Sequence, residues 1–244
     1  MRTPEPLVVL LHGTRMSSAV WQPYRPLLPG IEICAPDLPG HGDRVGEEFT
    51  LATVEAVIDR AVAQRRPGQP VLLAGHSLGG YLASWWAWRH PDQVDALVLL
   101  GATADPRSRW AGAYRWFARL VPRVRPERLA TFSNRLMWLV GARGDKAAAL
   151  PDASGYAVLP QAWDLVMTHC SPDLLRVLDC PVVLANGQWD QMRADVAAHA
   201  AAAKRSRVVT VPRATHLMPI THPRQVAAII AETVDELSGP ADRP

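Results

Sequence analysis

The sequence predicts an α/β fold in which about six mostly parallel strands form one sheet flanked by helices. Two observations lead to this prediction. Short runs of apolar residues, rich in branched side chains, recur along the chain, and stretches with apolar residues at helical spacing lie between them. Strands that alternate with helices form a parallel sheet with right-handed crossover connections. The six expected strands are residues 7–11, 31–35, 71–74, 96–100, 181–185 and 207–211.

The size and composition of the chain favour a soluble globular protein. At 244 residues it fits one domain, or one domain with an insertion, that buries a sizeable core without disulfides or metal. Its three cysteines show no C-x-x-C spacing, so we expect neither a disulfide framework nor a zinc site. The first apolar run holds only five residues, too few for a signal peptide or a membrane span. We therefore expect a cytoplasmic protein with no transmembrane segment.

The first strand, residues 7–11, runs directly into the turn His12-Gly13. A glycine turn at the carboxyl end of a parallel strand is where open α/β sheets bind ligands, and the backbone N–H of Thr14 lies at that place. The second strand is followed by a turn-dense loop at residues 36–42. Thr50 is expected to cap a helix over residues 50–65 that covers the sheet.

The third strand ends in the pattern Gly-x-Ser-x-Gly, and a buried helix follows it. So abrupt a turn holds Ser77 in strained backbone geometry and leaves little room for a Cβ at Gly75 or Gly79. It exposes the serine hydroxyl and aims the N–H of Leu78, at the start of the helix, toward an oxyanion that forms beside Ser77. The alternative is a glycine-rich connection with an incidental serine.

The alternation of strands and helices stops after the fourth strand. Residues 104–175 contain no expected strand, four tryptophans and at least two amphipathic helical stretches. We expect this insertion to be a helical lid over the active edge of the sheet. The expected organisation is thus a first core part at 1–103, the lid at 104–175 and a second core part at 176–244.

The lid is strongly basic. Between Asp105 and Lys146 it holds nine arginines and one lysine against three acidic residues, a net charge of +7, whereas the rest of the chain carries −4. This pattern is typical of a solvated arginine-rich helix face, or of a segment that binds an anionic substrate group or a charged surface. Trp110 belongs to an aromatic stripe that either packs the lid or contacts substrate. No nucleic-acid partner is expected, and the oligomeric state is left open.

Three side chains that follow strand ends suit nucleophilic catalysis. Ser77, Asp190 and His216 each follow the carboxyl end of an expected parallel strand, so all three should meet at one edge of the sheet. A serine is a poor nucleophile unless an imidazole that is itself oriented by a carboxylate lies within hydrogen-bond reach. Asp105, after the fourth strand, is an alternative acid. A last helix is expected over residues 225–237.

Taken together, these motifs resemble the α/β-hydrolase superfamily across the whole core. The matching segments are the His12-Gly13 turn with Trp21, Asp37 to Gly42, the elbow Gly75 to Gly80, His90-Pro91-Asp92 with Val94, Gly187-x-x-Asp190, and His216 with Pro223. The order Ser, Asp, His along the chain also matches that family.

The resemblance implies Ser77 as nucleophile, His216 as base, Asp190 as its orienting acid, and the backbone N–H groups of Thr14 and Leu78 as the oxyanion hole. It further implies a cofactor-free, metal-free serine hydrolase. Such an enzyme cleaves a carboxylic ester, thioester or lactone of a small-molecule acyl substrate through an acyl-enzyme.

Some positions depart from the family pattern. Thr215 stands where a glycine commonly precedes the histidine, and Arg44 stands where a serine is common. Arg15, beside the oxyanion turn, is a candidate for binding a substrate carboxylate or a solvated surface residue.

Two alternative functions stay open within the same fold. The basic lid and the loop after the second strand are also similar to the menaquinone-pathway lyase of this superfamily, which eliminates pyruvate from an anionic substrate. However, Tyr81 stands where that lyase carries an arginine. A ligand-binding member without activity is the other alternative. The remaining core histidines, His12, His41, His76 and His90, are interpreted as turn or packing residues.

Overall fold

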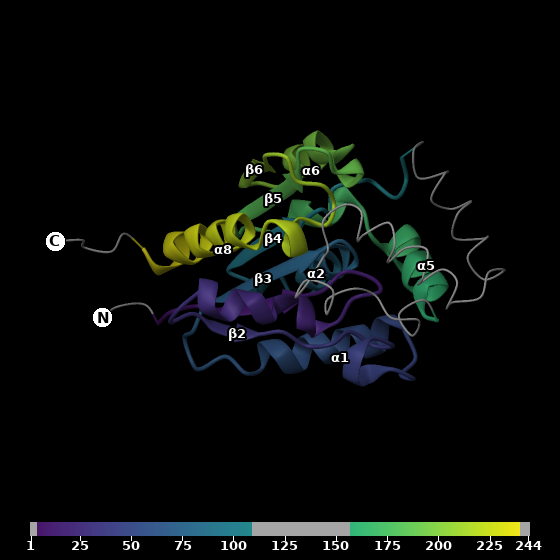
Figure 1. Ribbon diagram of the computed structural model, residues 1–244, viewed down its shortest axis with the longest axis horizontal. Coiled ribbons are helices and arrows are strands. Elements are labelled where there is room, and N and C mark those ends of the chain that lie inside the picture. Colours follow the sequence, from purple (N-terminus) through teal and green to yellow (C-terminus); the bar gives the residue numbers. More distant parts are fainter. Residues whose placement is uncertain (1–3, 109–156, 240–244) are drawn as a thin grey trace.

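A single parallel sheet organises the protein (Figure 1). The computed structural model describes residues 4–108 and 157–239, and within them six strands pair side by side in the order β2-β1-β3-β4-β5-β6. The strands are β1 (Leu7–Leu11), β2 (Glu32–Cys34), β3 (Val71–His76), β4 (Ala96–Leu100), β5 (Val182–Gly187) and β6 (Ser206–Val211). Every pair is parallel, so the expected α/β fold with about six mostly parallel strands is confirmed.

Helices cover both faces of the sheet (Figure 1). On one face lie α1 (Leu51–Val62), α2 (Leu78–Arg89), α5 (Leu159–His169), η7 (Pro172–Val177) and α6 (Val196–Ala202). On the other lie η1 (Ser18–Leu27), α7 (Met218–Thr221) and α8 (Pro223–Ser238). None of the helices in the described ranges is long and apolar enough to cross a membrane.

The strands are buried on both faces, which explains why they read as unbroken apolar runs. Successive side chains of a strand point to opposite faces. In β1, Leu7, Val9 and Leu11 therefore join the core beside α1 and α2, while Val8 and Leu10 join the core beside η1 and α8.

The helix after the second strand begins where the sequence predicts. Thr50 is its N-cap, and its side chain accepts a hydrogen bond from the N–H of Thr53 at 3.2 Å. The Thr53 hydroxyl in turn accepts from the N–H of Thr50 at 3.0 Å, which completes a capping box. The helix ends at Val62, so residues 63–65 of the expected helix lie outside it.

Several elements differ from the sequence expectations, and β2 and α6 differ most clearly. The edge strand β2 spans three residues, Glu32–Cys34, and is shorter than the expected run at 31–35. Helix α6 was not expected, because its sequence Val-Ala-Ala-His-Ala-Ala-Ala shows no alternation of polar and apolar faces. Of the expected lid, residues 104–108 and 157–175 are described; they contain α5, which packs against α2, and no strand.

The register of the sheet brings the loops of interest to one edge. Leu11 at the end of β1 lies beside Gly75, and His76 at the end of β3 lies beside Leu100 at the end of β4. Gly187 at the end of β5 lies beside Val211 at the end of β6. The loops that carry Thr14, Ser77, Asp190 and His216 therefore all leave the sheet at its carboxyl edge.

Candidate active site

Ser77 lies in the sharp turn between β3 and α2. Its φ of 51° and ψ of −116° belong to a region that non-glycine residues rarely adopt. A Cβ on Gly75 would collide with the carbonyl of Gly79, and a Cβ on Gly79 would collide with the carbonyl of Leu11. The two glycines thus let α2 pack directly on the ends of β3 and β1, which holds the turn in this conformation.

The structure brings Ser77, His216 and Asp190 together. Nε2 of His216 lies 3.0 Å from Oγ of Ser77, and Nδ1 of His216 lies 3.0 Å from Oδ1 of Asp190. A carboxylate can only accept, so the imidazole proton sits on Nδ1, and Nε2 is left to accept the hydrogen of the serine hydroxyl. This is the arrangement that lets an imidazole remove a proton from an attacking serine.

The carboxylate of Asp190 is held in its charged form. Burial, with only 2% of the residue exposed, favours the neutral acid. The hydrogen bond from His216 and the 2.8 Å bond from the N–H of Met192 outweigh burial, and the pKa of Asp190 lies below its ordinary 3.8. An ionised carboxylate in this position can stabilise an imidazolium.

The loop that carries Asp190 is anchored to the end of β4 by Thr103. The buried hydroxyl of Thr103 lies 3.0 Å from Oδ1 of Asn186 and 3.1 Å from the carbonyl of Met192, and one hydrogen serves both acceptors. The carbonyl of Thr103 accepts from the N–H of Asp195 at 3.2 Å. Thr103 was not among the expected site residues, and no sequence motif marks it.

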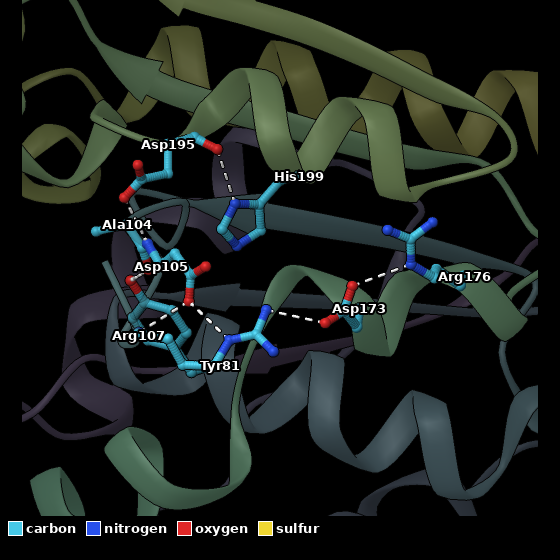
Figure 2. Close-up of polar contacts among 8 residues, drawn as sticks. All are labelled: Tyr81, Ala104, Asp105, Arg107, Asp173, Arg176, Asp195 and His199. Atoms are coloured by element: carbon cyan, nitrogen blue, oxygen red, sulfur yellow. Dashed lines mark hydrogen bonds and ion pairs between the residues drawn. The ribbon is translucent and has the colours of Figure 1, made fainter. Parts of the chain in front are cut away.

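Asp105, the alternative acid, bonds to Arg107 and Asp195 (Figure 2). Its Oδ1 accepts from the backbone N–H of Arg107 at 2.9 Å and from the guanidinium of the same residue at 3.4 Å. Its own N–H donates to Oδ2 of Asp195 at 2.8 Å, and Arg107 also pairs with Asp173 at 2.9 Å. The carboxylate bonded to His216 is that of Asp190, whereas Asp105 bonds to Arg107, which in turn joins residues 104–108 to Asp173.

The two expected oxyanion donors lie on segments that meet beside Ser77. Leu78 is the first residue of α2, so its N–H has no acceptor within the helix. Thr14 follows β1, whose end is pressed against the first turn of α2 at Gly79. Backbone N–H groups without an acceptor can stabilise the charge that develops on an attacked carbonyl.

His12 shapes the turn before Thr14. Its Nδ1–H donates to the carbonyl of Gly13 at 2.8 Å, and its Nε2 accepts from the N–H of Leu38 at 3.0 Å. Burial, reinforced by the nearby His41, lowers the pKa of His12 to about 4. The neutral imidazole thus joins the loops after β1 and β2, in agreement with its interpretation as a turn residue.

The expected substrate-binding residues are only partly described. Arg15 lies next to Thr14, half-buried, with a φ of 62° that reflects the tightness of the turn. Trp110 lies outside the described residues. Tyr81 is buried on α2, and its hydroxyl donates to the carbonyl of Ala104 at 2.7 Å (Figure 2). It therefore contributes a neutral group at the position where the lyase carries an arginine.

Comparisons with known proteins agree with this architecture. Residues 8–229 match the model of the Alpha/beta hydrolase family. A pimeloyl-[acyl-carrier protein] methyl ester esterase of Neisseria meningitidis serogroup A is 30% identical over 97% of this chain and 78% of its own length. The same enzyme from serogroup C is 28% identical over 93% of each chain. The structure of a thermophilic esterase from Thermogutta terrifontis superimposes with a TM-score of 0.77 at 25% identity, over 96% of this chain and 91% of that one.

Proposed function

Because the chain belongs to the alpha/beta hydrolase family, we propose that it hydrolyses carboxylic esters by a serine mechanism through an acyl-enzyme. The observation that carries the proposal is the hydrogen-bonded series from Ser77 through His216 to Asp190. The names of the relatives, which are methyl ester esterases and an esterase, support the same reaction class.

The geometry suits each step of that reaction. Oγ of Ser77 attacks the ester carbonyl while Nε2 of His216 takes its proton, and Asp190 stabilises the resulting imidazolium. The N–H groups of Thr14 and Leu78 receive the negative charge on the carbonyl oxygen. His216 then protonates the leaving alcohol, and an acyl group remains on Ser77. A water molecule, deprotonated by His216, releases the acid and restores the serine.

We propose an ester with a small alcohol, such as the methyl ester of an acyl chain, as the substrate class. This proposal rests on the methyl ester esterases that match more than nine tenths of the chain. Thioesters and lactones would react through the same acyl-enzyme. The +7 charge of residues 105–146 favours a substrate with an anionic group. We further propose that residues 104–175 form the lid over this site.

No observation in the described residues favours the two alternatives. The lyase interpretation needs a cation after the elbow, and Tyr81 supplies a neutral phenol whose hydroxyl is committed to Ala104. A pure binding protein has no need of an ionised Asp190 oriented on His216.

The proposal is tested by hydrolysis of methyl and p-nitrophenyl esters with acyl chains from acetyl to palmitoyl. Ser77→Ala should lower kcat by about 10⁶-fold, because the nucleophile is removed. Ser84→Ala is the matched control: Ser84 is a buried serine on the same helix whose hydroxyl donates to the carbonyl of Gly80 at 3.0 Å. Activity that survives in Ser77→Ala, or that is lost equally in Ser84→Ala, would refute the assignment of Ser77 as the nucleophile.

A further inference from the structure

His76, the residue before Ser77, points away from the nucleophile into the opposite layer of the fold. Along β3, Leu72, Ala74 and His76 fall on the face covered by η1 and α8, because successive side chains alternate. His76 is only 1% exposed, and it ends this row of apolar residues at the carboxyl edge of the sheet. A buried polar ring at that place calls for partners.

The ring of His76 contacts the segments that carry both the base and the oxyanion turn. Its Nε2 lies 2.9 Å from the backbone carbonyl of His216, and the centroids of the two imidazole rings are 4.9 Å apart. A Cβ on Gly13 would lie 2.7 Å from Nδ1 of His76, so the ring packs directly on the backbone of that turn. One side chain thus spans the loops after β1 and β6 and is covalently next to Ser77.

These contacts define the protonation of His76. A carbonyl oxygen can only accept, so His76 carries its proton on Nε2 and donates it to His216. Nδ1 is buried and has no hydrogen-bond partner among the described residues. Burial and the nearby His216 lower the pKa of His76 to about 3, while Asp190 opposes and His12 reinforces this shift. The ring therefore adds no charge when His216 becomes an imidazolium.

We propose that His76 is a positioning residue that aims the base at the nucleophile, which rests on the proposed role of His216 in ester hydrolysis. His216 lies in the connection between β6 and α7, outside regular secondary structure. Its side chain is held by Asp190 at Nδ1 and contacts Ser77 at Nε2, but neither contact fixes the main chain of His216. The hydrogen bond from His76 to the His216 carbonyl fixes the main chain of His216. The ring of His76, which packs beside the imidazole of His216, limits the rotation of that imidazole.

Two substitutions with the same amide group separate this role from simple packing. In His76→Gln the amide nitrogen reaches about as far as Nε2 of histidine and can still donate to the His216 carbonyl. In His76→Asn the amide is one methylene shorter and cannot reach that carbonyl. We expect His76→Asn to lower kcat by about 10²-fold with KM nearly unchanged, as a displacement of about 1 Å does, and His76→Gln to recover most of that loss.

His199 provides a matched control (Figure 2). It is 3% exposed, and its Nδ1–H donates to the backbone carbonyl of Asp195 at 3.0 Å, so it too is a buried histidine bonded to a carbonyl. His199→Gln and His199→Asn should change the free energy of unfolding in urea, and the two variants should have the same kcat. If His76→Asn does not fold, His76→Met, which fills the site without a donor, takes its place in the comparison with His76→Gln.

The rate of labelling by a fluorophosphonate distinguishes failure of this proposal from failure of the proposed function. Wild-type protein that does not label at Ser77 would overturn both. If wild type labels, and the glutamine and asparagine variants of His76 label and turn over at equal rates, the positioning role is wrong. A slower rate confined to the asparagine or methionine variant supports it.

Discussion

Acidification should destabilise this protein because burial keeps His12 and His76 neutral in the folded state. Burial is the main cause that lowers the pKa of His12 from 6.5 to about 4 and that of His76 from 6.5 to about 3. Between pH 6.5 and 4 the unfolded chain binds protons at these two sites that the folded protein does not bind. Stability therefore falls as the pH is lowered through this window.

The magnitude follows from the two shifts. A pH of 5 lies about 1.5 units below the unfolded pKa of histidine, whereas His12 and His76 are still neutral in the folded protein. This difference corresponds to a loss of about 2 kcal/mol for each residue and about 4 kcal/mol for both. Urea unfolding followed by circular dichroism at pH 7 and pH 5 measures this loss. His76→Gln removes one of the two sites, so its loss between the same pH values should be smaller by about 2 kcal/mol.

Two results would refute this reasoning. Equal free energies of unfolding at pH 7 and pH 5 would mean that the buried histidines accept protons in the folded protein. A pH dependence of the same size in wild type and His76→Gln would mean that the linkage comes from groups other than His76.

Two further predictions concern the acid and its support. Asp190→Asn should lower kcat by about 10⁴-fold, whereas Asp105→Asn should leave it near the wild-type value, because Asp190 bonds to His216 and Asp105 bonds to Arg107. A reversed ranking in steady-state ester hydrolysis would reassign the acid. Thr103→Val keeps the shape of the side chain but removes the hydrogen-bond donor to Asn186 and Met192. The free energy of unfolding in urea should therefore fall by about 1–3 kcal/mol. An unchanged unfolding free energy would show that the Thr103 hydroxyl does not anchor the loop.

Much of the fold follows from local sequence patterns. Strands buried on both faces leave unbroken apolar runs, and each of the six runs corresponds to a strand of the sheet. The elbow is equally visible, because only glycine fits at positions 75 and 79 where α2 meets β1 and β3. Helix α6 escaped prediction since seven mostly alanine residues carry no periodic signal.

Part of the candidate site also follows from the sequence, and part depends on contacts that only the structure shows. Parallel strands bring their carboxyl ends to one edge, so a sequence can predict that Ser77, Asp190 and His216 approach each other. Asp105 also follows a strand, and the G-x-x-D pattern favours Asp190 over it. The contacts differ in the same sense, because Asp190 bonds to His216 and Asp105 bonds to Arg107. The contact of His76 with His216 joins residues 140 positions apart, and no pattern at His76 indicates it.

The central claim is that Ser77 attacks the substrate and carries the acyl group. Wild-type protein incubated with a fluorophosphonate should gain one adduct by intact mass, on the peptide that contains Ser77, and should lose esterase activity in the same proportion. Complete loss of activity with Ser77 unmodified, or full activity with Ser77 modified, would contradict the account.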